Sequence, residues 1–224
     1  MVAYLSEKAD KRIINALKQK GFEVRTLAPF SALKSPVDTH ADMLLLNVDG
    51  KIFKHTDYTI HDIGNLIEVD EPMGPNYPND VLLNIAIVGK NAFCNIKHAS
   101  KTILQHLEQN GYSINHVSQG YSHCSTLIIS DNAIITADDG IATKAQESGI
   151  DVLKISSGHI SLPPYEYGFI GGASGVTNDA VYFCGSLSHH PNGEEIRNFC
   201  TSYGKQIVEL CDMPLEDIGG ILFI

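Results

Sequence analysis

A pattern of helix, glycine and strand that recurs four times is the feature that most restricts how this chain can fold. The four copies of the glycine and strand read KGFEVRTL, NGYSINHV, SGIDVLKI and YGKQIVEL. Each follows a segment whose apolar residues have helical spacing, and a glycine directly after such a segment is typical of a helix end. The clearest copy of the whole unit runs from His123 to Ile155 and predicts strand, turn, strand, helix and strand.

Patterns of two strands joined by a turn precede the helices or, in one case, a short helix slot at residues 59–65. They read LLLNVDGKIF, LNIAIVGKNAFC, LIISDNAIIT and GVTNDAVYF. The first strands of these pairs are predicted at residues 43–48, 79–88, 127–129 and 171–177. Turn residues at the centre of each pattern favour a hairpin.

These patterns divide the chain into units at residues 36–72, 78–118, 121–156 and 168–211, and into a fifth made of 213–224 together with 1–29. A unit of about 40 residues cannot bury its apolar faces alone, so such units predict an array or a closed ring. Pairing of a last strand at 221–224 with a first strand at 2–5 would close the ring and remove exposed sheet edges. We therefore predict a single α/β domain, a five-unit ββαβ propeller. The alternative is an ordinary α/β sandwich.

The charge and apolar pattern exclude several classes of partner. The 16 basic and 26 acidic residues give a net charge of −10, which disfavours nucleic acid and is compatible with a small cationic ligand. No stretch approaches the roughly 20 apolar residues of a membrane span. The first residues, MVAYLSEKADKR, lack the apolar segment of a signal peptide.

The cysteine content indicates a reducing cellular compartment. The chain has 5 cysteines, an odd number, without CxxC spacing. This usage suits reduced thiols in a cytoplasmic protein rather than a disulfide framework. We therefore expect a cytoplasmic protein that binds neither nucleic acid nor membrane, and the sequence gives no indication of its oligomeric state.

A ring of five such units resembles the pentein fold, also called the guanidino-group-modifying enzyme fold. Its members include arginine and agmatine deiminases, dimethylarginine hydrolases, amidinotransferases and the ribosome anti-association factor of archaea and eukaryotes. The resemblance covers the whole chain as a pattern, and the chain is most similar to the small uncharacterised bacterial branch. It implies binding of, or action on, a small guanidino, amidino or amino compound in a central channel. As an enzyme, the protein would be a hydrolase or transferase acting on C–N bonds of amidines.

The resemblance leaves one alternative, a non-catalytic pentein that binds a macromolecule through one flat face, as the anti-association factor does. Two short motifs resemble those of the enzymes. His40-Ala41-Asp42 is similar to their His-x-Asp near the start of an inner strand, although it lies in an earlier unit. Gly219-Gly220 is similar to the pair that precedes their catalytic cysteine, but ILFI follows it and no cysteine lies downstream.

In a ring of such units, the starts of the first strands converge on a central channel. The polar residues at these positions are His40, Asp42, Asn79, Asp80, Asn84, His123, Cys124, Ser174 and Asp217. Converging carboxylates suit a guanidinium or ammonium ligand, because charge-assisted hydrogen bonds to such groups are strong and directional. We predict as ligand-binding residues Asp42, Asp80, Asn84, His123 and Ser174.

Cys124 is the candidate nucleophile, and His40 is its candidate base. Thiolate chemistry needs a partner that lowers the thiol pKa. Neighbouring residues on a strand point to opposite faces, so His123 cannot be that partner, whereas His40 from another unit can. The alternatives are a Cys124 that serves as a small buried apolar residue, and a His40–Asp42 pair that only caps the strand.

Three remaining motifs do not predict a cofactor or a metal. The glycine-rich run at residues 171–175 has neither a P-loop lysine nor dinucleotide spacing. His189 and His190 have no nearby set of Cys or carboxylate ligands. The loop at residues 156–168 contains His159, Tyr165, Glu166 and Tyr167; it is either a lid over the channel mouth suited to a cation, or a plain connector.

Overall fold

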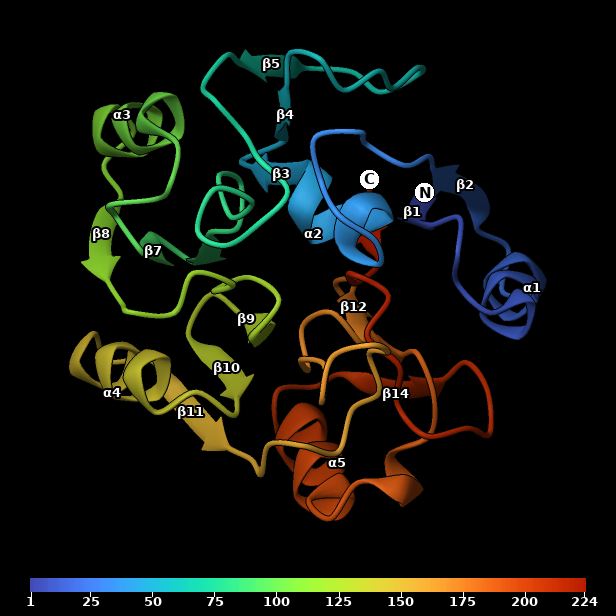
Figure 1. Ribbon diagram of the computed structural model, residues 1–224. Helices are drawn as coiled ribbons and strands as arrows, with labels where there is room; N and C mark the ends of the chain where they lie inside the picture. Colours follow the sequence, from blue (N-terminus) through green and yellow to red (C-terminus); the bar gives the residue numbers. More distant parts are fainter.

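The computed structural model describes all 224 residues and shows five three-stranded sheets arranged as a ring (Figure 1). In sheet order the strands are β15 (Leu222–Phe223), β1 (Val2–Ser6) and β2 (Glu23–Leu27); β3 (Leu45–Val48), β4 (Lys51–His55) and β5 (Leu66–Val69); β6 (Ala86–Val88), β7 (Asn91–Cys94) and β8 (Ser113–His116); β9 (Thr126–Ser130), β10 (Ala133–Thr136) and β11 (Asp151–Lys154); and β12 (Ser174–Val176), β13 (Ala180–Phe183) and β14 (Gln206–Glu209). In every sheet the middle strand runs antiparallel to the first and parallel to the third. Each sheet with its connections is called a unit below.

The two ends of the chain complete one of these sheets. β15 pairs antiparallel with β1, and Ala3 lies opposite Phe223 in this register. Hydrogen bonds between Val2 and Ile224 extend the pairing, at 2.6 Å and 2.9 Å. The predicted pairing of the termini is therefore confirmed, and N and C lie close together near the centre of the ring (Figure 1).

Helices connect the second and third strands of four units. These connecting helices are α1 (Lys11–Gln19), α3 (Lys101–Gln109), α4 (Asp139–Glu147) and α5 (Gly193–Ser202). The chain also has a short helix, α2 (Ala41–Leu44), and two 3-10 turns, η1 (Val37–Thr39) and η2 (Leu187–His189). Asp10, Ser100 and Asp138 cap α1, α3 and α4 through their side chains. Glycines with φ between +74° and +88° follow the four connecting helices, as the repeated motif predicts.

The predicted helix slot at residues 59–65 is wrong, because the β4–β5 connection contains no helix. Asp62 and Asn65 adopt left-handed φ values of 58° and 53° there. Left-handed residues interrupt a right-handed helix, and so short a segment could not repay the cost of helix nucleation.

The predicted first strands also begin too early. The extended parts start at Leu45, Ala86 and Ser174, which are two, seven and three residues after the predicted positions. The short helix α2 precedes β3, and the corresponding residues 122–125 form a turn before β9, closed by a hydrogen bond of 2.9 Å from Ser125 N to Tyr121 O. Such turns satisfy backbone groups locally where five chain segments converge and no neighbouring strand is available.

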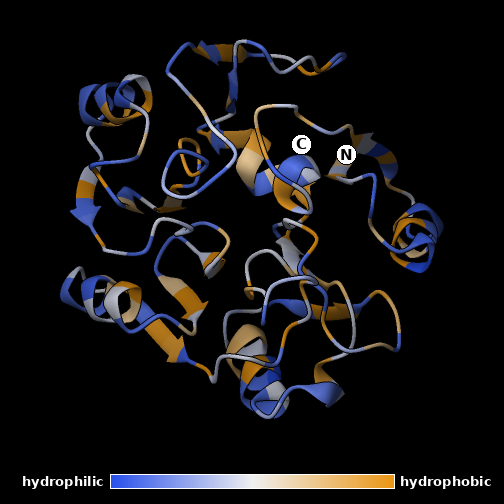
Figure 2. Ribbon diagram, viewed as in Figure 1, coloured by the Kyte–Doolittle hydropathy of each residue, from blue (hydrophilic) through white to orange (hydrophobic).

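The hydrophobic core consists of five clusters, and each cluster lies between two neighbouring units. Phe53 of the β3–β5 unit, for example, packs with Ile103 on α3 of the next unit. Every unit therefore shares its core with two others, which is the physical reason why the repeat forms a ring. The peripheral helices carry hydrophilic residues along with their hydrophobic ones (Figure 2). None of the helices combines the length and hydrophobicity that crossing a membrane requires.

Candidate functional site

A cavity of about 200 Å³ brings together side chains from three units at the centre of the ring. His40, Cys124 and Asp217 line it, and the loop at residues 156–168 supplies Tyr165, Glu166 and Tyr167 to its wall. The candidate nucleophile and the candidate base therefore share one cavity. The remaining lining residues are Val37, Tyr121, Leu162 and Phe169.

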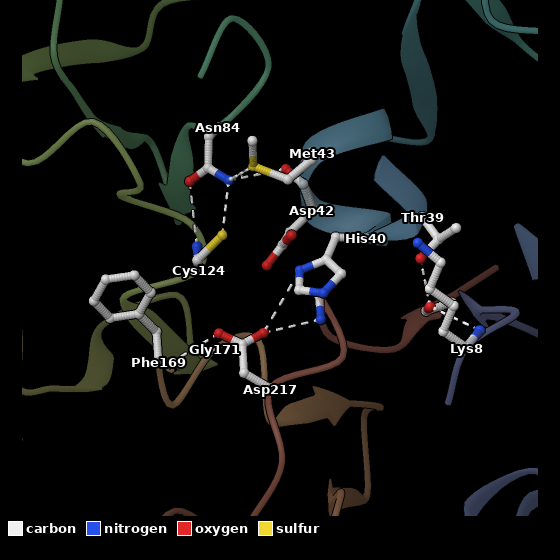
Figure 3. Close-up of polar contacts among 12 residues, drawn as sticks. Lys8, Thr39, His40, Asp42, Met43, Asn84, Cys124, Phe169, Gly171 and Asp217 are labelled. Carbon is white, nitrogen blue, oxygen red and sulfur yellow. Dashed lines mark hydrogen bonds and ion pairs between the residues drawn. The ribbon is translucent and has the colours of Figure 1, made fainter. Parts of the chain in front are cut away.

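The short helix α2 positions the His-x-Asp motif. His40 is its extended N-cap residue, with φ −71° and ψ 126°, and Asp42 lies in its first turn. In Figure 3 the Asp42 carboxylate points between the Cys124 thiol and the His40 ring. Both Asp42 oxygens are buried and accept no hydrogen bond from a nitrogen or oxygen donor, and the Cys124 thiol is the polar group beside them. Burial, and then the charge of nearby Asp217, raise the pKa of Asp42.

Asp217 faces the same space from the C-terminal segment. Its Oδ2 accepts from Phe169 N at 2.9 Å, and its Oδ1 accepts from Gly219 N at 3.0 Å. The same Oδ1 lies 3.7 Å from His40 Nδ1. Burial raises the pKa of Asp217 as well. Asp217 is the buried acidic group in the wall of this cavity, which contains no lysine or arginine, and the carboxyl group of Asp42 lies beside it (Figure 3). This arrangement suits a cation better than an anion.

His40 is neutral at neutral pH. Burial, assisted by the positive charge of Lys8, lowers the pKa of His40 to about 3. A neutral imidazole is the form that can accept a proton, but a pKa of about 3 makes His40 a weak base in the free protein.

Asn84 fixes Cys124 in place. Its Oδ1 accepts from the backbone N–H groups of His123 at 2.7 Å and Cys124 at 3.2 Å. Its Nδ2 donates to Cys124 Sγ at 3.0 Å and to Asp42 O at 3.1 Å. Asn84 thus ties the Cys124 turn to α2. Burial, and then the charges of Asp42 and Asp217, raise the pKa of the Cys124 thiol well above its usual value, so the thiol is protonated in the free protein.

None of the five predicted ligand-binding residues lines this cavity. Asp42 and Asn84 lie beside it, next to Cys124 (Figure 3). Asp80 accepts a hydrogen bond of 2.7 Å from Tyr121 OH and contacts the cavity wall through that residue. Ser174 donates to Ile170 O at 2.8 Å, and with His123 it lines a second cavity of about 650 Å³, which Asp42 also lines. Burial lowers the pKa of His123 to about 4.

From the sequence, Tyr165 and Tyr167 have a candidate role as part of a loop over the channel mouth, but Tyr121 and Phe169, which also line the cavity, have none. Tyr121 and Phe169 are single residues in turns and loops, with no motif that marks them. Asp217 is named among the converging polar residues, and its signal is its position two residues before Gly219-Gly220.

Replacing Asn84 with alanine is expected to lower the free energy of unfolding by about 3 kcal/mol, because two buried backbone N–H groups lose their acceptor. Asn84→Asp is the matched control, since it keeps the acceptor oxygen and loses the donor to Cys124. Denaturant unfolding measures both variants. A loss below about 1 kcal/mol for Asn84→Ala would contradict the capping role.

Comparison with known proteins places the chain in a family. Residues 4–222 match a family of unknown function (DUF6873). The chain belongs to this family. No protein of curated function matches its sequence.

The fold is shared with solved structures of guanidino-group-modifying enzymes. A DDAH mutant from Pseudomonas aeruginosa, complexed with citrulline, has a TM-score of 0.56 at 12% identity over 94% of this chain and 83% of that one. Agmatine deiminase from C. jejuni has a TM-score of 0.56 at 14% identity, over 93% of this chain and 87% of that one. An amidinotransferase from Microseira wollei has a TM-score of 0.52 at 11% identity, over 91% of this chain and 74% of that one. This DUF6873 protein therefore has the pentein fold that the sequence predicts.

Proposed function

We propose that the protein binds a small guanidinium or amidinium compound in the central cavity and acts on it through Cys124. The observation that carries this proposal is that buried Asp217 lines the cavity together with Cys124 and His40, with the buried carboxyl group of Asp42 beside them. A buried carboxylate without a partner is costly, and a planar cation with several N–H donors offsets that cost.

Binding of such a cation would also prepare the thiol. A positive charge beside Asp42 and Asp217 lowers the pKa of both carboxyl groups and offsets the negative field that raises the pKa of Cys124. The thiolate would therefore form only when a cationic ligand is present.

The expected reaction has two steps. First, the thiol proton passes to His40, and Cys124 Sγ bonds to the central carbon of the amidinium group. The C–N bond to the leaving amine then breaks as the amine takes the proton. Second, water attacks the same carbon, the C–S bond breaks, and the thiol is regenerated with release of a urea or an amide. An amine in place of water would give amidine transfer.

The relatives of known activity support this proposal at the level of reaction class. They are a hydrolase, a deiminase and an amidinotransferase, and one of them has citrulline bound. Their similarity to this chain lies in the fold, so the residues assigned here rest on the geometry of this chain alone.

Chloroacetamidine and chloroacetamide test the proposal as a matched pair, because they differ mainly in the amidinium charge. In both reagents a thiolate displaces chloride from the methylene carbon. We expect chloroacetamidine to label Cys124 at least about tenfold faster, relative to the neutral amide, than it labels the partly exposed Cys211. Asp217→Asn should reduce this preference. Site-resolved mass spectrometry measures each cysteine separately.

Two outcomes would count against the proposal. Equal selectivity at Cys124 and Cys211 would show that the carboxylates do not recruit a cation. Fast labelling of Cys124 without protection by any guanidine or amidine would favour the alternative, a pentein that binds a macromolecule.

A further inference from the structure

We infer that the natural ligand carries a second cationic group and no carboxylate, which makes it a guanidino- or amidinoalkylamine rather than an amino acid. This inference rests on the proposed function and deepens it. It comes from the outer part of the cavity, beyond His40, Cys124 and Asp217, which the reaction itself does not use.

Aromatic rings form the outer wall. The Tyr121 and Tyr167 rings each lie 6.2 Å from the Phe169 ring, measured between centroids. Tyr165 and Tyr167 are 47% and 37% exposed, so they stand at the mouth of the cavity. A cation over the face of such rings is attracted by their quadrupole, whereas an anion is repelled.

The only charged side chain in this aromatic part of the wall is acidic. Glu166 lies between Tyr165 and Tyr167 in sequence, is exposed, and forms no ion pair. Asp80 accepts a hydrogen bond of 2.7 Å from the Tyr121 hydroxyl, at the end of that ring. Both carboxylates favour an ammonium group at the mouth of the cavity.

No residue in the wall is suited to bind a carboxylate. The lining contains no lysine and no arginine, and His40 is neutral at neutral pH. Lys8 lines a neighbouring cavity and forms an ion pair with Asp38 at 2.5 Å. The carboxylate of a guanidino amino acid would therefore lose its water and meet only aromatic and acidic groups.

Competition with chloroacetamidine labelling of Cys124 tests this inference on the full-length protein. Three competitors of equal chain length separate the contributions of the ammonium and carboxylate groups at the end of the ligand. They are a guanidinoalkylamine, an alkylguanidine with a neutral tail, and the guanidino amino acid arginine. We expect the guanidinoalkylamine to protect at a concentration at least about tenfold lower than arginine does, with the alkylguanidine in between.

Glu166→Gln separates the acidic mouth from the rest of the wall. It should weaken protection by the guanidinoalkylamine about threefold and leave the alkylguanidine unchanged, because only the former places a charge near Glu166. Glu194→Gln, an exposed residue on α5, is the matched control and should change neither competitor. Glu166→Arg should improve protection by arginine.

Each outcome has a distinct meaning. Protection by arginine at or below the concentration of the guanidinoalkylamine would overturn this inference and leave the proposed function standing. An equal response of Glu166→Gln and Glu194→Gln would also overturn it. Failure of all three competitors to protect Cys124 would instead count against the proposed function itself.

Discussion

Replacing Asp42 with asparagine is expected to raise the free energy of unfolding at pH 8 and to abolish cation binding at the centre of the ring. In the unfolded chain Asp42 loses its proton near the usual aspartate pKa of about 4. In the folded protein burial and Asp217 raise the pKa of Asp42, so the proton is retained to higher pH. The folded state then holds more protons than the unfolded state, and stability falls as the pH rises above about 4.

Asparagine has nearly the shape of protonated aspartate and never ionises. We therefore expect Asp42→Asn to add about 2 kcal/mol at pH 8 and to have little effect near pH 4, which flattens the pH dependence. Denaturant unfolding at both pH values measures this change. Asp179→Asn, at an exposed position, is the control and should leave stability within about 0.5 kcal/mol at either pH.

The opposite result would be informative. If Asp42→Asn destabilises the protein at pH 8, then ionised Asp42 has a favourable partner in the folded state, and the argument for a ligand cation loses its main support. If it stabilises the protein and chloroacetamidine still selects Cys124, then Asp217 alone recruits the cation.

Replacing Gly219 with alanine is expected to cost about 3 kcal/mol or more of folding free energy, because two effects add. Gly219 has φ of +77°, which disfavours any side chain. An added Cβ would also lie 2.2 Å from His40 Cβ and 2.4 Å from His40 Cα. The substitution therefore pushes against the residue that the site needs as its base.

Gly111→Ala is the matched control for Gly219→Ala. Gly111 has nearly the same φ, +75°, and a Cβ there would meet nothing within 4 Å. It should cost only the backbone strain, about 1 kcal/mol. Thermal or denaturant unfolding gives both values, and failure of the Gly219 variant to fold is the extreme form of the expected result. Equal losses in the two variants would mean that the chain relieves the contact with His40 by a small shift.

The sequence alone determined the repeat and the way in which it closes. The helices, their terminal glycines and the hairpins depend on residues close together in the chain, and apolar spacing and turn residues report those directly. The pairing of β15 with β1 follows from counting strands, because the N-terminal segment has two strands and a helix but no first strand, and the C-terminal segment ends in a single strand. The predicted helix at residues 59–65 is wrong because the segment is short and polar, so its apolar spacing is too weak to indicate a helix.

Only the tertiary structure decided which polar side chains meet. The sequence predicts that all the polar residues at the strand starts converge, because the first strands of a ring of units start at its central channel. The chain forms helical turns there, and these turns direct Cys124 towards Asp42 and His40 while His123 and Ser174 line the other cavity.

The tertiary structure also decided the electrostatics of the site. Asn84 binds the Cys124 turn across a separation of 40 residues, and Asp217 caps Phe169 across 48. Contacts at such separations leave no pattern in a single sequence. Burial, which raises the pKa of Asp42, is a property of the closed ring and of no segment within it.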